Sequence, residues 1–256
     1  MIRFSTAFAA LTSALACSLA SAVTVVTPTA MQGWSVETYG TSTPAPFGGI
    51  TNAYPHLGNG SAEIRLADEG TTEVDWFYQL PTPQPLANLA QLSFDWYVSS
   101  LSTTPNHTTP AFAMYLNSPG GGRFIIWEGA YNGTSGGATQ DAWVSSEIVS
   151  DKFWLAGAGT GDCAGAAKYD TLSFFNATCF NNEATVESLV PFLGNGYAGT
   201  VFDGAFDNVS YGFTNGPAER FNFELSARSD VPEPTSMALI VVALAALVAA
   251  GRKKAR

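Results

Sequence analysis

The feature that most restricts the fold of this chain is the repeated alternation of apolar and polar residues between positions 61 and 225. In Glu73–Leu80 every second residue from Val74 onward is apolar, and Leu92–Val98 shows the same pattern. A period of two is that of a β-strand with one buried face. Similar segments, which bring the predicted number of strands to about ten, are Ser61–Leu66, Ala111–Leu116, Arg123–Trp127, Ala142–Val149, Leu172–Phe175, Val209–Phe213 and Phe221–Leu225.

Stretches rich in glycine and proline separate these strands and predict turns at Pro81–Pro85, Ser118–Gly122 and Asn132–Gly137. Outside the two ends of the chain, no stretch of 10–15 residues has sustained helical periodicity, although Leu86–Gln91 suits one helical turn. Many short strands joined by such turns are typical of a sandwich or barrel. We predict an all-β, jelly-roll-like antiparallel β-sandwich over residues 23–226, followed by a linker at 227–230.

The N-terminal segment 1–22 has the pattern of a secretory signal peptide. A single positive charge at Arg3 precedes an apolar stretch from Ala7 to Leu19, and small residues end the segment at Ala22. This order predicts export, with cleavage after Ala22. The alternative is a lipoprotein signal acylated at Cys17, which the small residue Ala14 three positions upstream disfavours.

The C-terminal segment 231–256 has the pattern of a membrane anchor. Thr235–Gly251 is seventeen uncharged, mostly apolar residues, and four basic residues follow it. As a helix this stretch is about 25 Å long, near the lower limit for crossing a bilayer. Basic residues resist translocation, so we expect a single transmembrane helix with its end in the cytoplasm and the β domain outside. The predicted cytoplasmic cluster consists of Arg252, Lys253, Lys254 and Arg256.

Pro232-Glu233-Pro234, the apolar segment and the basic cluster, in that order, resemble the PEP-CTERM sorting signal of Gram-negative bacteria. The resemblance implies that an exosortase, a membrane transpeptidase-like enzyme, recognises the Pro-Glu-Pro motif. It further implies transient anchoring in the inner membrane and then transfer to the cell surface or exopolysaccharide matrix. The partners that the resemblance implies are therefore an exosortase, the inner membrane and exopolysaccharide. This resemblance covers the tail and says nothing about the β domain.

The charge balance argues against nucleic acid as a partner. Residues 23–230 contain six basic and twenty acidic residues, a net charge of −14. Phosphate binding requires clustered lysine and arginine, and such a surface repels polyanions.

Cysteine and histidine usage predicts structural roles. Once a signal peptide is removed, Cys163 and Cys179 form an even pair in an oxidising compartment, and we expect them to form a disulfide. His56 and His107 both lie in polar segments near proline, and we expect exposed loop residues with no metal bound. The sequence therefore predicts a non-enzymatic protein without cofactor or catalytic residues.

Two other functions stay open for the β domain. Six tryptophans, at 34, 76, 96, 127, 143 and 154, could include a platform for sugars, although burial in strands is the default. The first alternative is thus a carbohydrate-binding module held at the surface. Carboxylate pairs such as Asp68-Glu69 or Glu73 and Asp75 raise a second, a secreted glycan-active enzyme, although a solvated strand edge explains them better.

The segment Phe202–Phe213 resembles the closing strand of galactose-binding-like and carbohydrate-binding jelly rolls. Within it, we expect Asp203 and Asp207 to flank a turn, where their carboxylates could bind a structural Ca²⁺. An ordinary Asp-Gly turn without metal is the alternative, and the spacing does not match a full calcium loop.

Overall fold

The structure, a computed structural model, describes residues 23–67, 72–157, 163, 165, 168–194 and 199–227. The predicted signal peptide, most of the linker, the predicted membrane helix and the Pro-Glu-Pro motif lie outside the described residues, and so does the pair Asp68-Glu69. Within the described part of the chain, no helix has the length and hydrophobicity that a membrane crossing requires.

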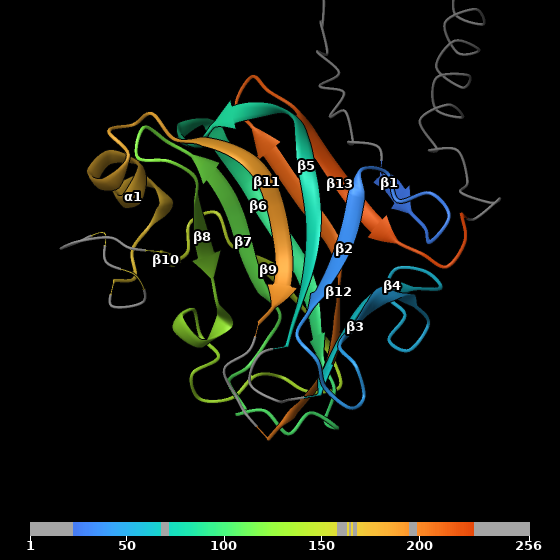
Figure 1. Cartoon of the computed structure of the whole chain (residues 1–256). Coiled ribbons are helices and arrows are strands. Elements are labelled where there is room, and N and C mark those ends of the chain that lie inside the picture. The colour runs from blue at the N-terminus through green and yellow to red at the C-terminus, as the bar shows by residue number, and fades with distance from the viewer. Residues whose placement is uncertain are drawn as a thin grey trace, which may run out of the picture.

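Two sheets pack face to face and form a β-sandwich, as the alternation predicts (Figure 1). The first sheet has seven strands: β1 (Val23–Val26), β3 (Phe47–Thr51), β4 (Ser61–Ala67), β6 (Leu89–Val98), β9 (Trp143–Glu147), β12 (Val201–Phe213) and β13 (Ala218–Phe223). The second has six strands in the order β10 (Phe153–Leu155), β8 (Arg123–Trp127), β7 (Ala111–Asn117), β11 (Thr185–Leu193), β5 (Glu73–Pro85) and β2 (Trp34–Tyr39).

Nearly every strand pair is antiparallel; among the described strands, only β1 lies parallel, against β13. The long strand β12 organises the seven-stranded sheet, because β6 pairs along one side of it while β4 and β13 share the other. Two 3₁₀ turns, η1 (Leu86–Asn88) and η2 (Gly129–Tyr131), and one helix, α1 (Leu172–Cys179), complete the described elements. The predicted helical turn after residue 85 is therefore confirmed.

Aromatic side chains fill the space between the sheets. Trp34 and Phe221 meet edge to face, with ring centroids 5.3 Å apart at 90°, and Trp76 and Phe206 do so at 5.5 Å and 86°. Phe223 contacts three of these rings. Each ring comes from the inward face of a strand, so the alternation that predicts the strands also builds this core.

The prediction of a strand at Leu172–Phe175 was wrong, because these residues begin helix α1. Thr171 caps the helix: its Oγ1 accepts a hydrogen bond from the backbone N–H of Phe174 at 3.3 Å. Leu172, Phe175 and Asn176 are buried, and their spacing of three and four residues is that of one helix face rather than one strand face.

The prediction of a turn at Pro81–Pro85 was also wrong, because β5 continues through these residues. The prolines stand two positions apart, so their missing N–H groups all lie along the same edge of the strand. Strand β2 pairs with β5 only as far as Tyr78, whereas β11 pairs with it up to Pro85. Beyond Tyr78 one edge of β5 therefore lacks a described partner strand, which is where prolines are tolerated.

Candidate ligand-binding face

The outer face of the six-stranded sheet carries a second apolar cluster, separate from the core. Cross-strand pairs align Trp154 with Ile126, Ile126 with Ala113, and Ala113 with Val190. We call this cluster the apolar band; it comprises Phe77, Ala113, Phe124, Ile126, Trp154, Ala156, Val190 and Phe192. Ala113, Ile126 and Val190 are buried in this cluster, and its other five members are half-buried.

A cavity of about 390 Å³ opens at one end of the apolar band. It lies where β5 and β7 begin and where β8 and β11 end, which is the lower end of the sheet in Figure 1. Ile126, Trp154 and Phe192 supply apolar walls. Polar groups come from Glu73, His107, Thr108, Thr109 and Glu128.

Carboxylates border this cavity. Cross-strand pairing places Asp75 beside Phe192 on one side and beside Glu37 on the other. Glu73 precedes Asp75 by two residues and shares its face. Burial, followed by the negative charges of Glu73 and Glu37, raises the pKa of Asp75 to about 8. The hydroxyl of Tyr39 donates a hydrogen bond to Glu37.

Glu128, directly after β8, is the second carboxylate that lines the cavity itself. Burial raises the pKa of Glu128, while the indole of Trp154 and the nearby His107 partly oppose that shift. The position of Glu128 at the cavity could not be predicted, because nothing in the local sequence marks this residue. Glu73 was expected on a solvated edge and instead lines the cavity.

A second group of aromatic rings lies on the seven-stranded sheet. His56 stacks on Trp143 with centroids 4.2 Å apart, Tyr54 stacks on Tyr97 at 4.5 Å, and Tyr97 and Trp143 are 5.6 Å apart. Nε2 of His56 lies 2.7 Å from a carboxylate oxygen of Asp95, and its side chain is only 20% exposed. His56 therefore lies in a loop, as expected, but the expectation that it is exposed was wrong. His107 lines the cavity.

Asp203 and Asp207 do not flank a turn, because both lie inside β12. Asp207 is fully buried, and its Oδ1 accepts hydrogen bonds from the backbone N–H groups of Asn208 and Phe223. Burial raises the pKa of Asp207 well above its usual value. Among the described residues, no group of three or more His, Cys, Asp or Glu side chains is placed to hold a metal ion.

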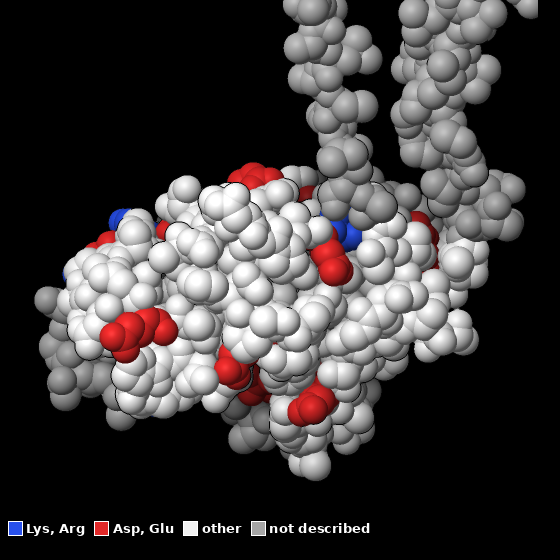
Figure 2. Space-filling view, turned by 90° about the horizontal axis from the view of Figure 1, so that it is seen from above, with Lys and Arg blue, Asp and Glu red and all other residues white. Residues whose placement is uncertain are grey.

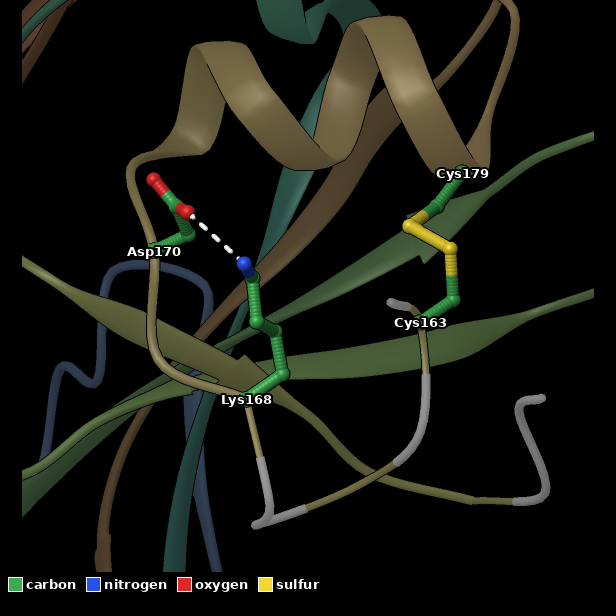
Figure 3. Close-up of a disulfide and its surroundings, with 4 residues drawn as sticks. All are labelled: Cys163, Lys168, Asp170 and Cys179. Carbon is green, nitrogen blue, oxygen red and sulfur yellow. Dashed lines mark ion pairs between the residues drawn. A yellow bond between two sulfur atoms is a disulfide. The ribbon is translucent and has the colours of Figure 1, made fainter. Parts of the chain in front are cut away.

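Cys163 and Cys179 form a disulfide in the structure, with Cα atoms 5.9 Å apart. Figure 3 shows that it ties the segment before α1 to the end of that helix. In the same segment Nζ of Lys168 lies 3.4 Å from a carboxylate oxygen of Asp170 and 4.5 Å from the ring centre of Phe174.

Burial accounts for four of the six tryptophans: Trp34, Trp76, Trp96 and Trp127 are at most 4% exposed. Trp143 and Trp154 are partly exposed. Of these two, Trp154 lines the described cavity, so it is the best candidate for contact with a ligand.

Comparison with solved structures gives several distant likenesses. The family 11 carbohydrate-binding module of a cellulosomal cellulase from Clostridium thermocellum is 13% identical, with a TM-score of 0.39 over 68% of this chain and 85% of that one. The same kind of module from that organism, in complex with a β-1,3-1,4-mixed-linked tetrasaccharide, is 13% identical to this chain, with a TM-score of 0.38 over 68% of this chain and 87% of that one. A structure of carbohydrate-binding modules of the β-sandwich superfamily is 10% identical to this chain, with a TM-score of 0.37 over 70% of this chain and 56% of that one. At these TM-scores the likenesses establish neither the fold nor a ligand of this chain.

No curated protein matches the chain significantly. A match of a different kind covers the C-terminal end. The motif description that matches there is that of PEP-CTERM protein sorting, and it includes the predicted Pro-Glu-Pro tripeptide, the apolar stretch and three of the four basic residues. Residues 230–254 of this chain thus carry a PEP-CTERM protein-sorting motif.

Proposed function

We propose that this chain is an exported, non-enzymatic protein that an exosortase sorts to the cell surface or the exopolysaccharide matrix. The match of residues 230–254 to a sorting motif carries the proposal. In it, segment 1–22 directs export, Pro232, Glu233 and Pro234 are recognised by the exosortase, and helix 235–251 holds the chain in the inner membrane until processing. Residues 23–226 are the exported domain, which we assign to the jelly-roll-like sandwiches.

Replacing Glu233 with Ala tests the sorting proposal. In a host that contains an exosortase, the variant should be exported but should accumulate as unprocessed precursor, because the only charge in the tripeptide is lost. Immunoblots of cell fractions measure the ratio of precursor to mature protein. Glu147→Ala on the exposed end of β9 is the matched control and should be processed normally. Normal processing of the Glu233 variant would leave only a simple tail anchor.

A second candidate function is polysaccharide binding by the exported domain. The apolar band and its cavity favour it: sugar rings pack their apolar faces on aromatic side chains, while carboxylate, imidazole and threonine groups can bond hydroxyls. Trp154, Phe192 and Ile126 supply the first kind of contact here, and Glu73, His107 and Glu128 the second.

Two tryptophan variants test polysaccharide binding. Trp154→Ala should weaken binding to polysaccharide about tenfold or more, the loss of roughly 1.4 kcal/mol or more of contact. Trp143→Ala removes another partly exposed tryptophan, on the other sheet, and should leave affinity unchanged. Pull-down with insoluble polysaccharides and calorimetry with soluble ones measure both. Equal affinity of wild type and Trp154→Ala would contradict binding at this cavity.

The same cavity contains the kind of residue that a glycan-active enzyme needs, because Glu73 and Glu128 both line it. The non-enzymatic proposal predicts that no new reducing ends form when the protein is incubated with the polysaccharides it binds. Release of reducing ends by the wild type, abolished in Glu128→Gln, would replace binding with hydrolysis as the function.

A further inference from the structure

We propose that the cavity recognises a polysaccharide that carries protonated amino groups, and that Glu73 and Glu128 bind its ammonium groups. This inference rests on the proposed polysaccharide binding and adds the chemical class of the ligand. Its basis is the distribution of charge around the cavity.

The described residues that line the cavity include two glutamates but no lysine or arginine. Glu73 and Glu128 line it, and Glu37 and Asp75 continue the acidic row along β2 and β5. His107 is the third titratable group in the lining. Internal segments outside the described residues add acidic residues but no lysine or arginine to the domain.

The lysines and arginines of the described domain interact elsewhere. Arg65 lies near Glu63 and over the ring of Phe47, and Arg220 donates to Asn208. Lys168 pairs with Asp170, and the charge of Lys152 acts on that same carboxylate. The guanidinium of Arg123 donates to the carbonyl oxygen of Gly122. On the face seen in Figure 2, acidic atoms are scattered widely and basic atoms appear at few places.

The described residues that line the cavity offer the acidic row no lysine or arginine as a partner. Oδ1 of Asp75 is buried without a hydrogen-bond partner among the described residues. Burial and the negative charges of Glu73 and Glu37 raise the pKa of Asp75 to about 8, so at pH 6 a proton on this carboxyl relieves the repulsion between the neighbouring carboxylates. An ammonium group bound beside Glu73 would offset this repulsion, since opposite charges within a few ångströms favour the ionised carboxylate. Binding should therefore also release a proton from Asp75 near neutral pH, because its pKa would fall from about 8.

The apolar walls of the cavity favour a sugar as the molecule that bears the amino group. Trp154, Phe192 and Ile126 present rings and an aliphatic side chain beside the carboxylates, which suits the apolar face of a sugar ring with an equatorial substituent reaching a glutamate. A uronic acid polymer would place like charges together and is disfavoured. We therefore commit to an amino-sugar polymer, and treat basic peptides as an outcome of the test.

The experiment compares glucosamine oligomers with N-acetylglucosamine oligomers of equal length, by calorimetry at pH 6 in low salt on the full chain in detergent. The glucosamine oligomer should bind at least tenfold more tightly. Glu73→Gln and Glu128→Gln should each lower the ratio of the two affinities severalfold, because each removes a negative charge on which the preference for the charged oligomer depends. Glu147→Gln, on the other sheet, should keep the preference.

Each outcome separates the two proposals. Equal affinity for both oligomers would overturn the amino-sugar inference and leave polysaccharide binding intact, whereas binding to no glycan would overturn both. Equally tight binding of a lysine peptide would identify a basic-peptide site instead. If a glutamine variant does not fold, the affinities of the wild type are measured at increasing salt concentration. Only the affinity for the charged oligomer should then fall.

Discussion

At the scale of single residues, Asp75 shows how the surroundings of a carboxyl group control stability. Its pKa of about 8 in the folded protein lies above the value of about 3.9 in an unfolded chain, because of burial and the charges of Glu73 and Glu37. The unfolded state therefore loses the proton at lower pH than the folded state does. The contribution of this group to the free energy of unfolding is fully present below about pH 4 and is lost progressively as the pH rises to 8.

At high pH the buried negative charge of Asp75 destabilises the folded state. Replacing Asp75 with Asn removes this charge with little change in the shape of the side chain. We expect Tm to rise by roughly 2–4 °C at pH 8, the shift for about 1 kcal/mol in a domain of this size, and to change little at pH 4. Thermal unfolding followed by circular dichroism at both pH values measures it. Glu147→Gln should shift Tm at neither pH. An equal gain for the Asp75→Asn variant at pH 4 and pH 8 would show that charge is not the cause.

Alternation predicts that Glu73 and Asp75 share a strand face, yet it cannot predict their neighbours. Phe192 stands opposite Asp75 only because β11 pairs with β5 in one particular register, although these residues are far apart in the sequence. The contact between His56 and Asp95 depends in the same way on the path of a loop. Long-range register and loop paths leave no mark in a local window of sequence, so the cavity could not be predicted.

At the scale of elements, alternation predicts strands such as β5, in which apolar residues face the core and polar residues face outward. The Thr185–Leu193 strand was missed because β11 has apolar residues on both faces, Val190 and Phe192 outward and Leu189 and Leu193 inward. Two other strands were missed for local reasons, because β1 has only four residues and β3 contains two glycines. The missed outward apolar residues of β11 are also among those that build the apolar band.

The disulfide is a covalent constraint on the segment around α1. It closes a loop of about fifteen residues, and in the chain-entropy model such a loop stabilises the folded state by about 3 kcal/mol. Replacing Cys163 and Cys179 together with Ser should therefore lower the free energy of unfolding by about this amount, measured by urea denaturation. Intact mass of the unreduced wild type should be two protons below that of the reduced protein. Two alkylatable thiols in the native, unreduced protein would contradict the bridge.

At the scale of the whole molecule, the folded domain ends close to the sorting motif. The loop between β3 and β4 holds the end of the domain: the backbone N–H of Leu225 donates to Oδ1 of Asn59 at 2.9 Å, and Nδ2 of Asn59 lies 3.3 Å from Oγ of Ser226. Pro232 follows Ser226 by six positions, which even fully extended span only about 20 Å. In the proposed sorting pathway, the exosortase must therefore act close to the folded domain.

The last prediction concerns what retains the precursor in the membrane until that step. The apolar segment 235–251 would span about 25 Å as a helix, whereas the hydrocarbon core is about 30 Å thick. A segment with no surplus apolar length depends on its flanks, and the long side chains of the terminal basic cluster can reach the headgroups while resisting translocation. Changing Arg252, Lys253, Lys254 and Arg256 to Gln should release part of the unprocessed precursor to the outside, measured by fractionation in a host without exosortase. Changing Arg65 and Arg123 in the domain to Gln is the control and should leave the precursor in the membrane. Full retention of the four-Gln variant would mean that the apolar segment anchors the chain by itself, and that the charges serve recognition alone.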